Sequence, residues 1–552
     1  MLTREWKKVV GELSSTPKQI PKVLQKSRAP RNVPTPPSTR EPSPPEDSET
    51  DDFESEGAVE EELLADSDEQ ISLLKMCWEG GTEAINFLLA KAVSPTATAP
   101  TEKSPKEWSY HDLACLNPQE LELWRTACTE ELNALKKRDT FELVDRPTNR
   151  KTIKNCWVFN VKSDRRRKAC LVAKGFSQVE GLDFDQIFSP VVCFETVRLI
   201  LALAALEGWT VSGLDVKSAY LYGTLDEEIY MEQPEGFIDA NHPKKVLKLQ
   251  KALYGLKQAG LAWWRAMKQS MEDLGFECLN SDAGVFLYRK KGNSCIAVVY
   301  VDDSFFTGPN KALNQQLKEA FMKRWECRDL GEITEFLGMK ISRSGSKIQL
   351  DQCTYLRTVL ERCGMHNSKK AATPLPAGYV PIRSEVVASP ELQSKYQMVI
   401  GSLLYLMLGT RPDITFAVTK MAQFAANPSK DHLNRVLYIC RYLVGTQSYR
   451  LMYDGGAGQG LSATTDSDWA ANTNDCRSQT GFFLRLAGVP ISWTSHAQKT
   501  IAFSSTEAKY MALSNCSQQV VWVHTLLGEL GYTLKPILIR LRTTSYVIIV
   551  PF

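Results

Sequence analysis

The stretch Tyr300-Val301-Asp302-Asp303 places two adjacent carboxylates between an apolar run, Cys295 to Val301, and the segment Ser304 to Gly308. Two such runs on either side of a short charged step predict a β-hairpin with its charge at the tip. Aspartate also favours ordinary turns, so the simplest interpretation of this stretch taken alone is a solvated loop. A functional interpretation therefore requires a partner elsewhere in the chain.

A second strand-like run, Trp209 to Val216, carries Asp215 near its end. Taken singly, Asp215 is equally well explained as a cap at a strand end. Two strands that each deliver an acid, in a chain without clustered His or Cys, predict a site built from oxygen ligands. Hard oxygen ligands select Mg2+ or Mn2+ over zinc.

Length and composition indicate a folded protein of several domains, because the 552 residues are 43% hydrophobic and 24% charged. No apolar run reaches membrane-spanning length, and the first residues lack a signal-peptide core. The fourteen cysteines are scattered without CxxC pairs, which favours free thiols in a reducing compartment. We therefore expect a soluble intracellular protein without membrane contact, either cytoplasmic, in a virus-like particle, or nuclear.

The charge is distributed unevenly along the chain. Residues 46–69 contain thirteen Asp or Glu and no Lys or Arg, although the net charge of the whole chain is +2. The rest is accordingly basic, which is compatible with binding a phosphate backbone but is also common on solvated surfaces. The acidic run follows a Pro-rich stretch, so residues 1–104 are expected to be disordered, as a linker or as the binding segment for a protein partner.

The ordered elements are expected from about residue 105. A helix should begin after Asn117 and continue to Leu135, and a strand should follow at residues 140–144. Residues 158–173 predict a strand, a basic turn and a second strand. Helical spacing returns at residues 355–363, 401–414 and 431–445.

Several motifs, in a fixed order, resemble the reverse transcriptases of copia-type LTR retrotransposons over about residues 106–535. They are Trp157-Val158-Phe159, Leu171 to Gln178, Phe188-Ser189-Pro190-Val191, Leu214 to Leu221, Ile229 to Phe237, Leu253 to Gln258, Tyr300 to Asp303, Asp329-Leu330-Gly331 and Phe336 to Met339.

The resemblance implies an α+β fold with the right-hand arrangement of a polymerase, in which fingers, palm and thumb precede a helical connection and an incomplete RNase H-like α/β domain. The expected boundaries are 1–104 for the N-terminal region, 105–345 for fingers and palm, 346–455 for thumb and connection helices, 456–536 for the partial RNase H-like domain and 537–552 for an aberrant tail.

The implied activity is RNA-directed DNA synthesis on an RNA template and a DNA primer, with dNTPs as substrates. Two metal ions about 4 Å apart, Mg2+ or Mn2+, activate the primer 3′-hydroxyl and neutralise the leaving pyrophosphate in such enzymes. We expect Asp215 and Asp302 to bridge the ions. Asp303 is given a supporting role, because consecutive strand side chains point to opposite faces.

The resemblance also implies nucleotide and primer contacts. Tyr220 matches the bulky residue beneath the incoming sugar, where a ring would collide with a 2′-hydroxyl, although it could be a core tyrosine. Gly255, Lys257 and Gln258 match the loop against the template base and nucleotide. The expected triphosphate contacts are Lys168 and Lys174, and the expected primer grip, or otherwise a buried strand, is Phe336, Leu337, Gly338 and Met339.

The second site resembles a copia-type RNase H with Asp466 and Glu507 in place. The chain has Lys509 where the family has a second glutamate, and residues 537–552 contain no acid, so we expect no RNase H activity. Cysteines at 170, 193 and 476 replace family arginines, which is typical of a decayed genomic copy. Two interpretations therefore remain, an active polymerase and an inert remnant that keeps the fold and nucleic-acid binding.

Overall fold

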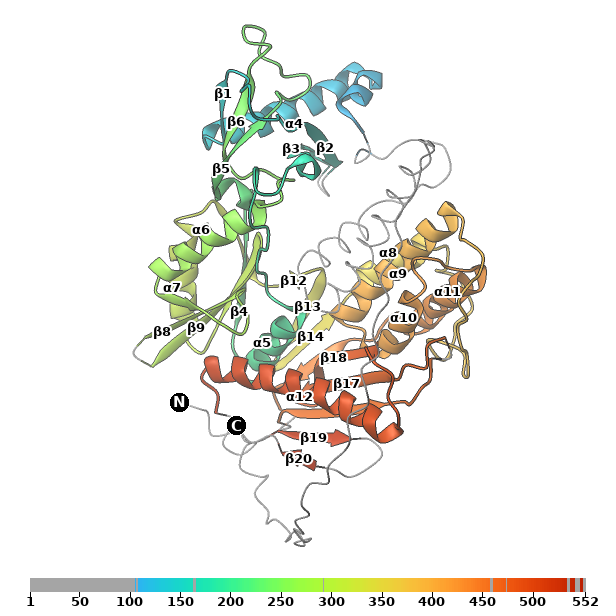
Figure 1. The fold of residues 1–552 in the computed structure, drawn as a ribbon. Helices are drawn as coiled ribbons and strands as arrows, with labels where there is room; N and C mark the ends of the chain where they lie inside the picture. The colour runs from blue at the N-terminus through green and yellow to red at the C-terminus, as the bar shows by residue number, and fades with distance from the viewer. Residues whose placement is uncertain are drawn as a thin grey trace, which may run out of the picture.

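The computed structural model describes residues 105, 108–161, 165–290, 292–456, 460–472, 474–533, 537–541 and 547–549. The chain is a mixed α+β protein, with one layer of sheet and helix at the top of Figure 1, a central sheet below it, helices to its right and a further sheet at the bottom. The expected disordered region at 1–104 lies outside the described residues.

The top layer is built on helix α4 (Pro118–Lys137), which begins where the sequence predicts. The Asn117 side chain accepts a hydrogen bond from the Glu120 N–H at 2.9 Å, and Pro118 occupies the first turn. The helix packs on strand β3 (Arg167–Ala173), which pairs antiparallel with β2 (Asn155–Val161). A three-stranded sheet completes the layer: β1 (Phe141–Val144), β6 (Val246–Lys251) and β5 (Thr224–Met231).

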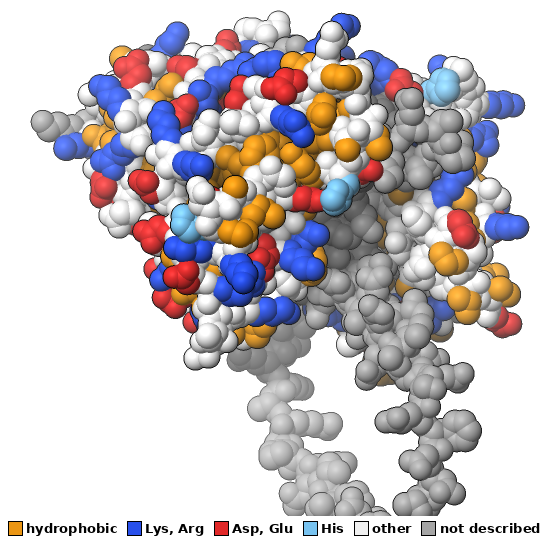
Figure 2. Space-filling view, turned by 90° about the horizontal axis from the view of Figure 1, so that it is seen from above, with side chains coloured by type: hydrophobic (Ala, Val, Ile, Leu, Met, Phe, Trp, Pro, Cys, Tyr) orange, Lys and Arg blue, Asp and Glu red, His pale blue; other side chains and the backbone are white. Residues whose placement is uncertain are grey.

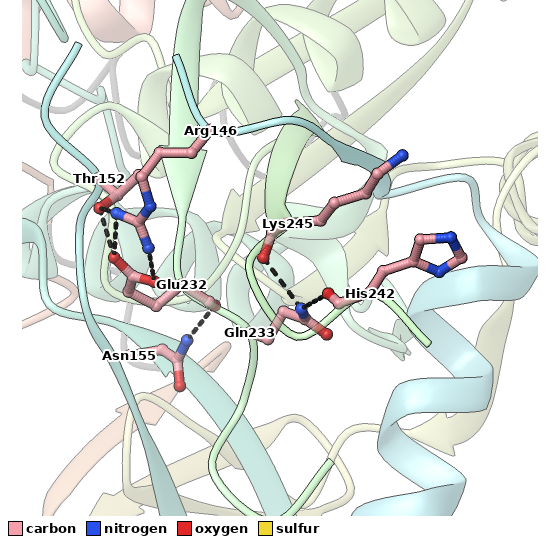
Figure 3. A network of polar contacts seen from close by, with 7 residues as sticks. All are labelled: Arg146, Thr152, Asn155, Glu232, Gln233, His242 and Lys245. Carbon is pink, nitrogen blue, oxygen red and sulfur yellow. Dashed lines mark hydrogen bonds and ion pairs between the residues drawn. The ribbon is translucent and has the colours of Figure 1, made fainter. Parts of the chain in front are cut away.

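The segment after β5 is fixed by a polar network around Glu232, shown in Figure 3. The Glu232 carboxylate accepts hydrogen bonds from the Arg146 guanidinium at 2.8 and 2.6 Å, and from the Thr152 hydroxyl. The hydrogen bond from Arg146, with the further help of Thr152, lowers the pKa of Glu232. The side chain of Gln233 donates to the carbonyls of His242 and Lys245, each at 2.9 Å. The motif Ile229 to Phe237 therefore organises the loop before β6.

The central sheet contains six antiparallel strands, and its inner strands are buried on both faces. Their order is β11 (Cys327–Glu332), β4 (Val211–Val216), β10 (Asp303–Thr307), β9 (Asn293–Tyr300), β8 (Val285–Lys290) and β7 (Phe276–Cys278).

Successive side chains of β9 point to opposite faces of the sheet, so they pack into two different hydrophobic cores. Cys295, Ala297 and Val299 pack with helices α6 (Ala259–Asp273) and α7 (Lys311–Met322). Ile296 and Val298 pack on the other face with helix α5 (Phe194–Leu206). A strand buried on both faces reads as a continuous apolar run, which is the pattern of Cys295 to Val301.

The helices after the central sheet begin at or before the predicted residues, but a strand precedes them in the segment expected to contain only helices. Residues 347–351 form a strand because they pair with both neighbours in a four-stranded sheet. That sheet has the order β12 (Glu335–Phe336), β13 (Met339–Ser344), β14 (Lys347–Asp351) and β15 (Leu451–Asp454). The expected boundary at residue 345 falls inside the β13–β14 hairpin. The helices are α8 (Cys353–Arg362), α9 (Pro390–Gly409), α10 (Thr415–Ala422) and α11 (Lys430–Gly445).

The last unit is a five-stranded sheet covered by the long helix α12 (Ser505–Glu529). Its strand order is β18 (Val489–Ala497), β17 (Gln479–Leu486), β16 (Ser462–Ser467), β19 (Leu538–Leu541) and β20 (Val547–Ile549). Strand β19 runs parallel to β16, and Ile539 is buried. The tail that the sequence marks as aberrant thus contributes two strands to this sheet.

No helix in the described part of the chain has the length and apolar character needed to cross a membrane. The thirteen cysteines in this part are all free thiols.

Arg198 joins the central sheet to the last unit. Its side chain is 1% exposed on α5, and its guanidinium donates to the carbonyls of Ile491 at 2.7 Å and of Gly409 at 3.0 Å. The guanidinium also lies 3.9 Å from the ring centroid of Trp493 on β18. One buried cation therefore satisfies carbonyls from α9 and β18 while lying on α5.

Replacing Arg198 should destabilise the whole assembly, because its carbonyl partners would stay buried without a donor. We expect Arg198→Met to lower the free energy of unfolding by on the order of 3 kcal/mol. Urea unfolding followed by tryptophan fluorescence measures the change. The control is Arg265→Met, which removes an exposed pair with Asp226 and should cost at most about 1 kcal/mol. Equal effects of the two substitutions would contradict this role.

Candidate functional site

The turn between β9 and β10 holds an unusual backbone conformation. Tyr300 pairs with Asp303, so Val301 and Asp302 form a two-residue turn as the sequence predicts. Val301 has a φ of +55°, which is rare for a β-branched residue and costs on the order of 1–3 kcal/mol. The Trp263 indole of α6 donates to the Val301 carbonyl at 2.7 Å, and the Val216 N–H donates to the Asp302 carbonyl at 2.8 Å. Both turn carbonyls are thus fixed by neighbouring elements.

This turn brings three carboxylates together. Asp303 lies directly opposite Asp215 in the pairing of β10 with β4, and Asp302 is joined to β4 through the Val216 N–H. Burial, followed by the negative charges of Asp302 and Asp215, raises the pKa of Asp303 to about 7. Asp302 belongs to the turn, so strand alternation does not separate it from Asp303. The sequence predicted only a supporting role for Asp303. In the structure, however, Asp303 is the residue that pairs directly with Asp215.

The donor set suits a hard divalent cation. In the described residues, no group of three or more His, Cys, Asp or Glu side chains is arranged to hold one metal ion. Mg2+ commonly takes only one or two carboxylates from the protein and completes its coordination with water and substrate phosphates. The charges of Asp302 and Asp215 add to burial in raising the pKa of Asp303, and a divalent cation would relieve this repulsion. The residues therefore fit an ion that is bound together with substrate.

Tyr220 lies beside this turn. Ser218, at a φ of +55°, directs the chain from β4 into the short helix η4 (Ala219–Tyr222). Burial and the nearby charge of Asp302 raise the pKa of Tyr220 to about 12. The expected sugar-contacting residue and the expected metal ligand are thus close neighbours.

The loop at Gly255 is packed tightly against the end of β3. Gly255 has a φ of +89°, and a Cβ there would lie 2.1 Å from the Ala173 carbonyl oxygen. Lys257 is exposed, with its ammonium 4.6 Å from the ring centroid of Phe184. Gly255 and Lys257 therefore occupy a fixed loop at the junction of the top layer and the central sheet.

Gln258 is engaged inside the protein. Its side chain is buried, accepts a hydrogen bond from the Gln178 amide at 3.0 Å and donates to the Asp183 carbonyl at 2.8 Å. The Gln178 side chain also accepts from the Lys257 N–H at 2.9 Å. Gln258 thus holds the loop in place. Its partner Gln178 was not predicted as a site residue from the sequence, although Gln178 is the last residue of the motif Leu171 to Gln178.

The two expected triphosphate lysines lie on and after β3. Lys168 is exposed and shares a strand face with Cys170 and Val172, because Ala169, Leu171 and Ala173 point into the core. Lys174 follows the strand, and its N–H donates to the Lys154 carbonyl at 2.8 Å. Part of the basic turn before β3, residues 162–164, lies outside the described residues.

The Phe336–Met339 stretch forms a tight hairpin between β12 and β13. Leu337 and Gly338 have φ values of +50° and +64°, the pattern of a type I′ turn. The side chains of Phe336, Leu337 and Met339 are buried, and the Tyr405 hydroxyl of α9 donates to the Leu337 carbonyl at 2.6 Å. Of these four residues only Gly338 is exposed.

The acidic residues of the last unit are less closely grouped than the three aspartates near Val301. Asp466 is on β16, and its charge adds to burial in raising the pKa of Asp468. The Glu507 carboxylate accepts a hydrogen bond from the Phe503 N–H at 2.7 Å, at the start of α12. Strand β19, which lies beside β16, carries no acid. Asp468 was not singled out by the sequence, although it stands two residues after Asp466.

Trp263 is a further site residue that the sequence did not single out. It belongs to the apolar face of α6, and nothing in the sequence connects it to a turn 38 residues later.

Comparison with known proteins agrees with the resemblance. Residues 138–377 match the family described as reverse transcriptase (RNA-dependent DNA polymerase). The chain is 40% identical over 430 residues to a retrovirus-related Pol polyprotein from transposon TNT 1-94 of Nicotiana tabacum, covering 75% of this chain and 32% of the relative. It is 30% identical over 311 residues to a putative transposon Ty5-1 protein of Saccharomyces cerevisiae, covering 56% of this chain and 100% of that protein.

The chain spans about a third of the length of the curated Pol polyproteins that it matches. Among solved structures it is similar to a foamy viral protease-reverse transcriptase in complex with double-stranded DNA, at a TM-score of 0.41 and 12% identity, over 82% of this chain and 67% of that one.

The raised pKa of Asp303 predicts a pH-dependent effect on stability. The pKa of this carboxyl group is higher in the folded chain than in the unfolded chain. The free energy of unfolding therefore falls as the pH rises from about 4 to about 7. In metal-free protein, Asp303→Asn should therefore raise the free energy of unfolding at pH 8 by on the order of 1–2 kcal/mol, with little change near pH 4. Urea unfolding at the two pH values measures this.

The matched control is Asp273→Asn. Hydrogen bonds from Gln269 and then Arg324 lower the pKa of Asp273, so its substitution should have the opposite sign at pH 8. A loss of stability at pH 8 on substituting Asp303 would show that the three acids do not repel one another.

Proposed function

The chain belongs to the reverse transcriptase family of copia-type transposon Pol polyproteins, and we propose that it is an RNA-directed DNA polymerase that extends a DNA primer on an RNA template. The observation that carries this proposal is the meeting of Asp215, Asp302 and Asp303 on two paired strands and one strained turn.

The three aspartates would hold two Mg2+ or Mn2+ ions together with the substrate. When bound, such ions supply activation of the primer 3′-hydroxyl and neutralisation of the leaving pyrophosphate. The chain's own contribution is to hold the carboxylates at one end of the central sheet before any substrate arrives. Trp263 and the Val216 N–H keep the turn from relaxing, which is the preorganisation that catalysis requires.

The nucleotide would lie between the catalytic turn and the loop at Gly255. Tyr220 would exclude a 2′-hydroxyl and so select dNTPs over rNTPs. Lys168 and Lys174 would bind the triphosphate, and Gly255 and Lys257 would contact the nucleotide and template base. Gln258 would act by holding this loop, since its amide is already bonded to Gln178 and Asp183.

The primer would rest on the hairpin of Phe336, Leu337, Gly338 and Met339. Phe336, Leu337 and Met339 are buried, so Gly338 would provide the contacting surface. Glu335 at the start of this hairpin adds to the charges that raise the pKa of Asp303, which supports a position of the hairpin near Asp303. We therefore assign it the position of the primer terminus.

Lys and Arg side chains are spread over the face seen from the top of Figure 1, among apolar and acidic ones (Figure 2). Such a surface is compatible with binding the phosphate backbones of template and primer. The thumb and connection would be the helices α8 to α11, and the RNase H-like domain the unit of β16 to β20 with α12.

Primer extension tests the proposed activity. The wild-type chain should incorporate dNTPs on an RNA template with Mg2+, and Asp302→Asn should lower the rate at least about a hundredfold, since it removes a ligand for the ions. Asp273→Asn, which changes an exposed carboxylate far along α6, should leave the rate within about twofold. Equal rates for wild type and Asp302→Asn would favour the alternative, an inert remnant that keeps the fold and its nucleic-acid binding.

The RNase H-like domain should be inactive. We expect no Mg2+-dependent cleavage of an RNA–DNA hybrid by the wild-type chain, and no recovery in Lys509→Glu, because β19 beside Asp466 offers no acid. Gel analysis of an end-labelled hybrid measures cleavage. Cleavage that disappears in Asp466→Asn would contradict the assignment.

A further inference from the structure

Tyr254 packs its ring against the ring of Tyr220. The two ring centroids are 4.9 Å apart, and the planes meet at 72°, an edge-to-face arrangement. Such pairs contribute about 0.5–1.5 kcal/mol beyond the area they bury. The ring of Tyr220 is therefore held on one side by Tyr254.

The backbone of Tyr254 cannot shift easily. The Ala173 N–H at the end of β3 donates to the Tyr254 carbonyl at 2.8 Å. The next residue, Gly255, contacts Gly175 so closely that a Cβ on Gly175 would lie 2.0 Å from the Gly255 carbonyl oxygen. The position of the Tyr254 ring is thus tied to β3 and the turn that follows it.

The charge of Asp302 in the catalytic turn acts on the Tyr254 hydroxyl. Burial raises its pKa, and the next contributions come from the charge of Asp302 and from Cys170. Cys170 shares a strand face with Val172, whose side chain would lie 2.7 Å from a Cβ on Gly255. Tyr254 therefore stands between β3 and Asp302, with Tyr220 at its side.

We propose that Tyr254 is a positioning residue for sugar selection, which holds the Tyr220 ring in the orientation that excludes a 2′-hydroxyl. The role rests on the proposed function, because Tyr220 selects sugars only if this site binds nucleotides. Without the Tyr254 ring, Tyr220 gains the freedom to turn away from the sugar, and a ribonucleotide fits. The contact from Ala173 makes the same selection depend on the placement of β3.

Nucleotide binding to a stalled complex tests the proposal without any chemical step. The full chain is assembled on an RNA template with a dideoxy-terminated DNA primer, and the Kd values of the matched dNTP and rNTP are measured with Ca2+. Tyr254→Leu should reduce the preference for dNTP about five- to tenfold, mainly by tightening rNTP binding. Tyr254→Phe keeps the ring and should stay within about twofold of the wild type.

Two further variants separate positioning from general damage. Tyr288→Leu removes a ring that packs on Phe276 at 5.6 Å between β8 and β7, and should leave the preference unchanged. In the Tyr220→Ala background, adding Tyr254→Leu should change nothing more, since the effect passes through Tyr220.

The outcomes are distinguishable from those of the proposed function. A wild-type complex that binds no nucleotide contradicts both. If the wild-type complex prefers dNTP and Tyr254→Leu shows the same preference as the wild type, the role of Tyr254 is overturned and the proposed function is not. Weaker binding of dNTP and rNTP by the same factor in Tyr254→Leu also overturns it, because that is the result of general damage to the pocket.

Discussion

The positive φ of Val301 is the constraint on which the candidate polymerase site depends. A β-branched residue does not adopt this conformation unless its surroundings impose it. Here the Trp263 indole and the Val216 N–H fix the two carbonyls of the turn, and the pairing of β10 with both β9 and β4 fixes its ends. The turn in return sets Asp302 beside β4 and Asp303 opposite Asp215.

The central sheet supplies the rigidity that this turn requires. Its inner strands are buried on both faces, on one side under α6 and α7 and on the other in a core shared with α5, α12 and the strands β16 to β18. Arg198 and Trp493 tie these parts together inside that shared core. The unit of β16 to β20 with α12 is therefore part of the packing of the central sheet.

Much of this arrangement could be predicted from the sequence, because it follows from local patterns. The apolar run before Asp302 predicted β9 and its hairpin, and Asn117 predicted the start of α4. The strand-like run that contains Asp215 predicted the acid-bearing strand β4, which pairs with β10. The motifs predicted the family, which the comparisons confirm. The roles of the individual site residues stay predictions.

The rest depends on contacts between segments far apart in the chain, for which the sequence offers no local signal. Strand β15 pairs with β14, although the helices α8 to α11 separate the two strands in the sequence. Because this pairing leaves no local signal, only helices were expected in this segment. The burial of Gln258 against Gln178, and the contact of Tyr254 with Tyr220, likewise arise only when the top layer meets the central sheet.

The most direct test of the account is a count of bound Mn2+ by electron paramagnetic resonance in the complex with RNA template, dideoxy-terminated primer and matched dNTP. The account predicts two bound ions in the wild type, loss of at least one in Asp215→Asn and in Asp302→Asn, and no change in Asp466→Asn. Equal binding in all four chains would contradict the assignment of the metal site to the Val301 turn.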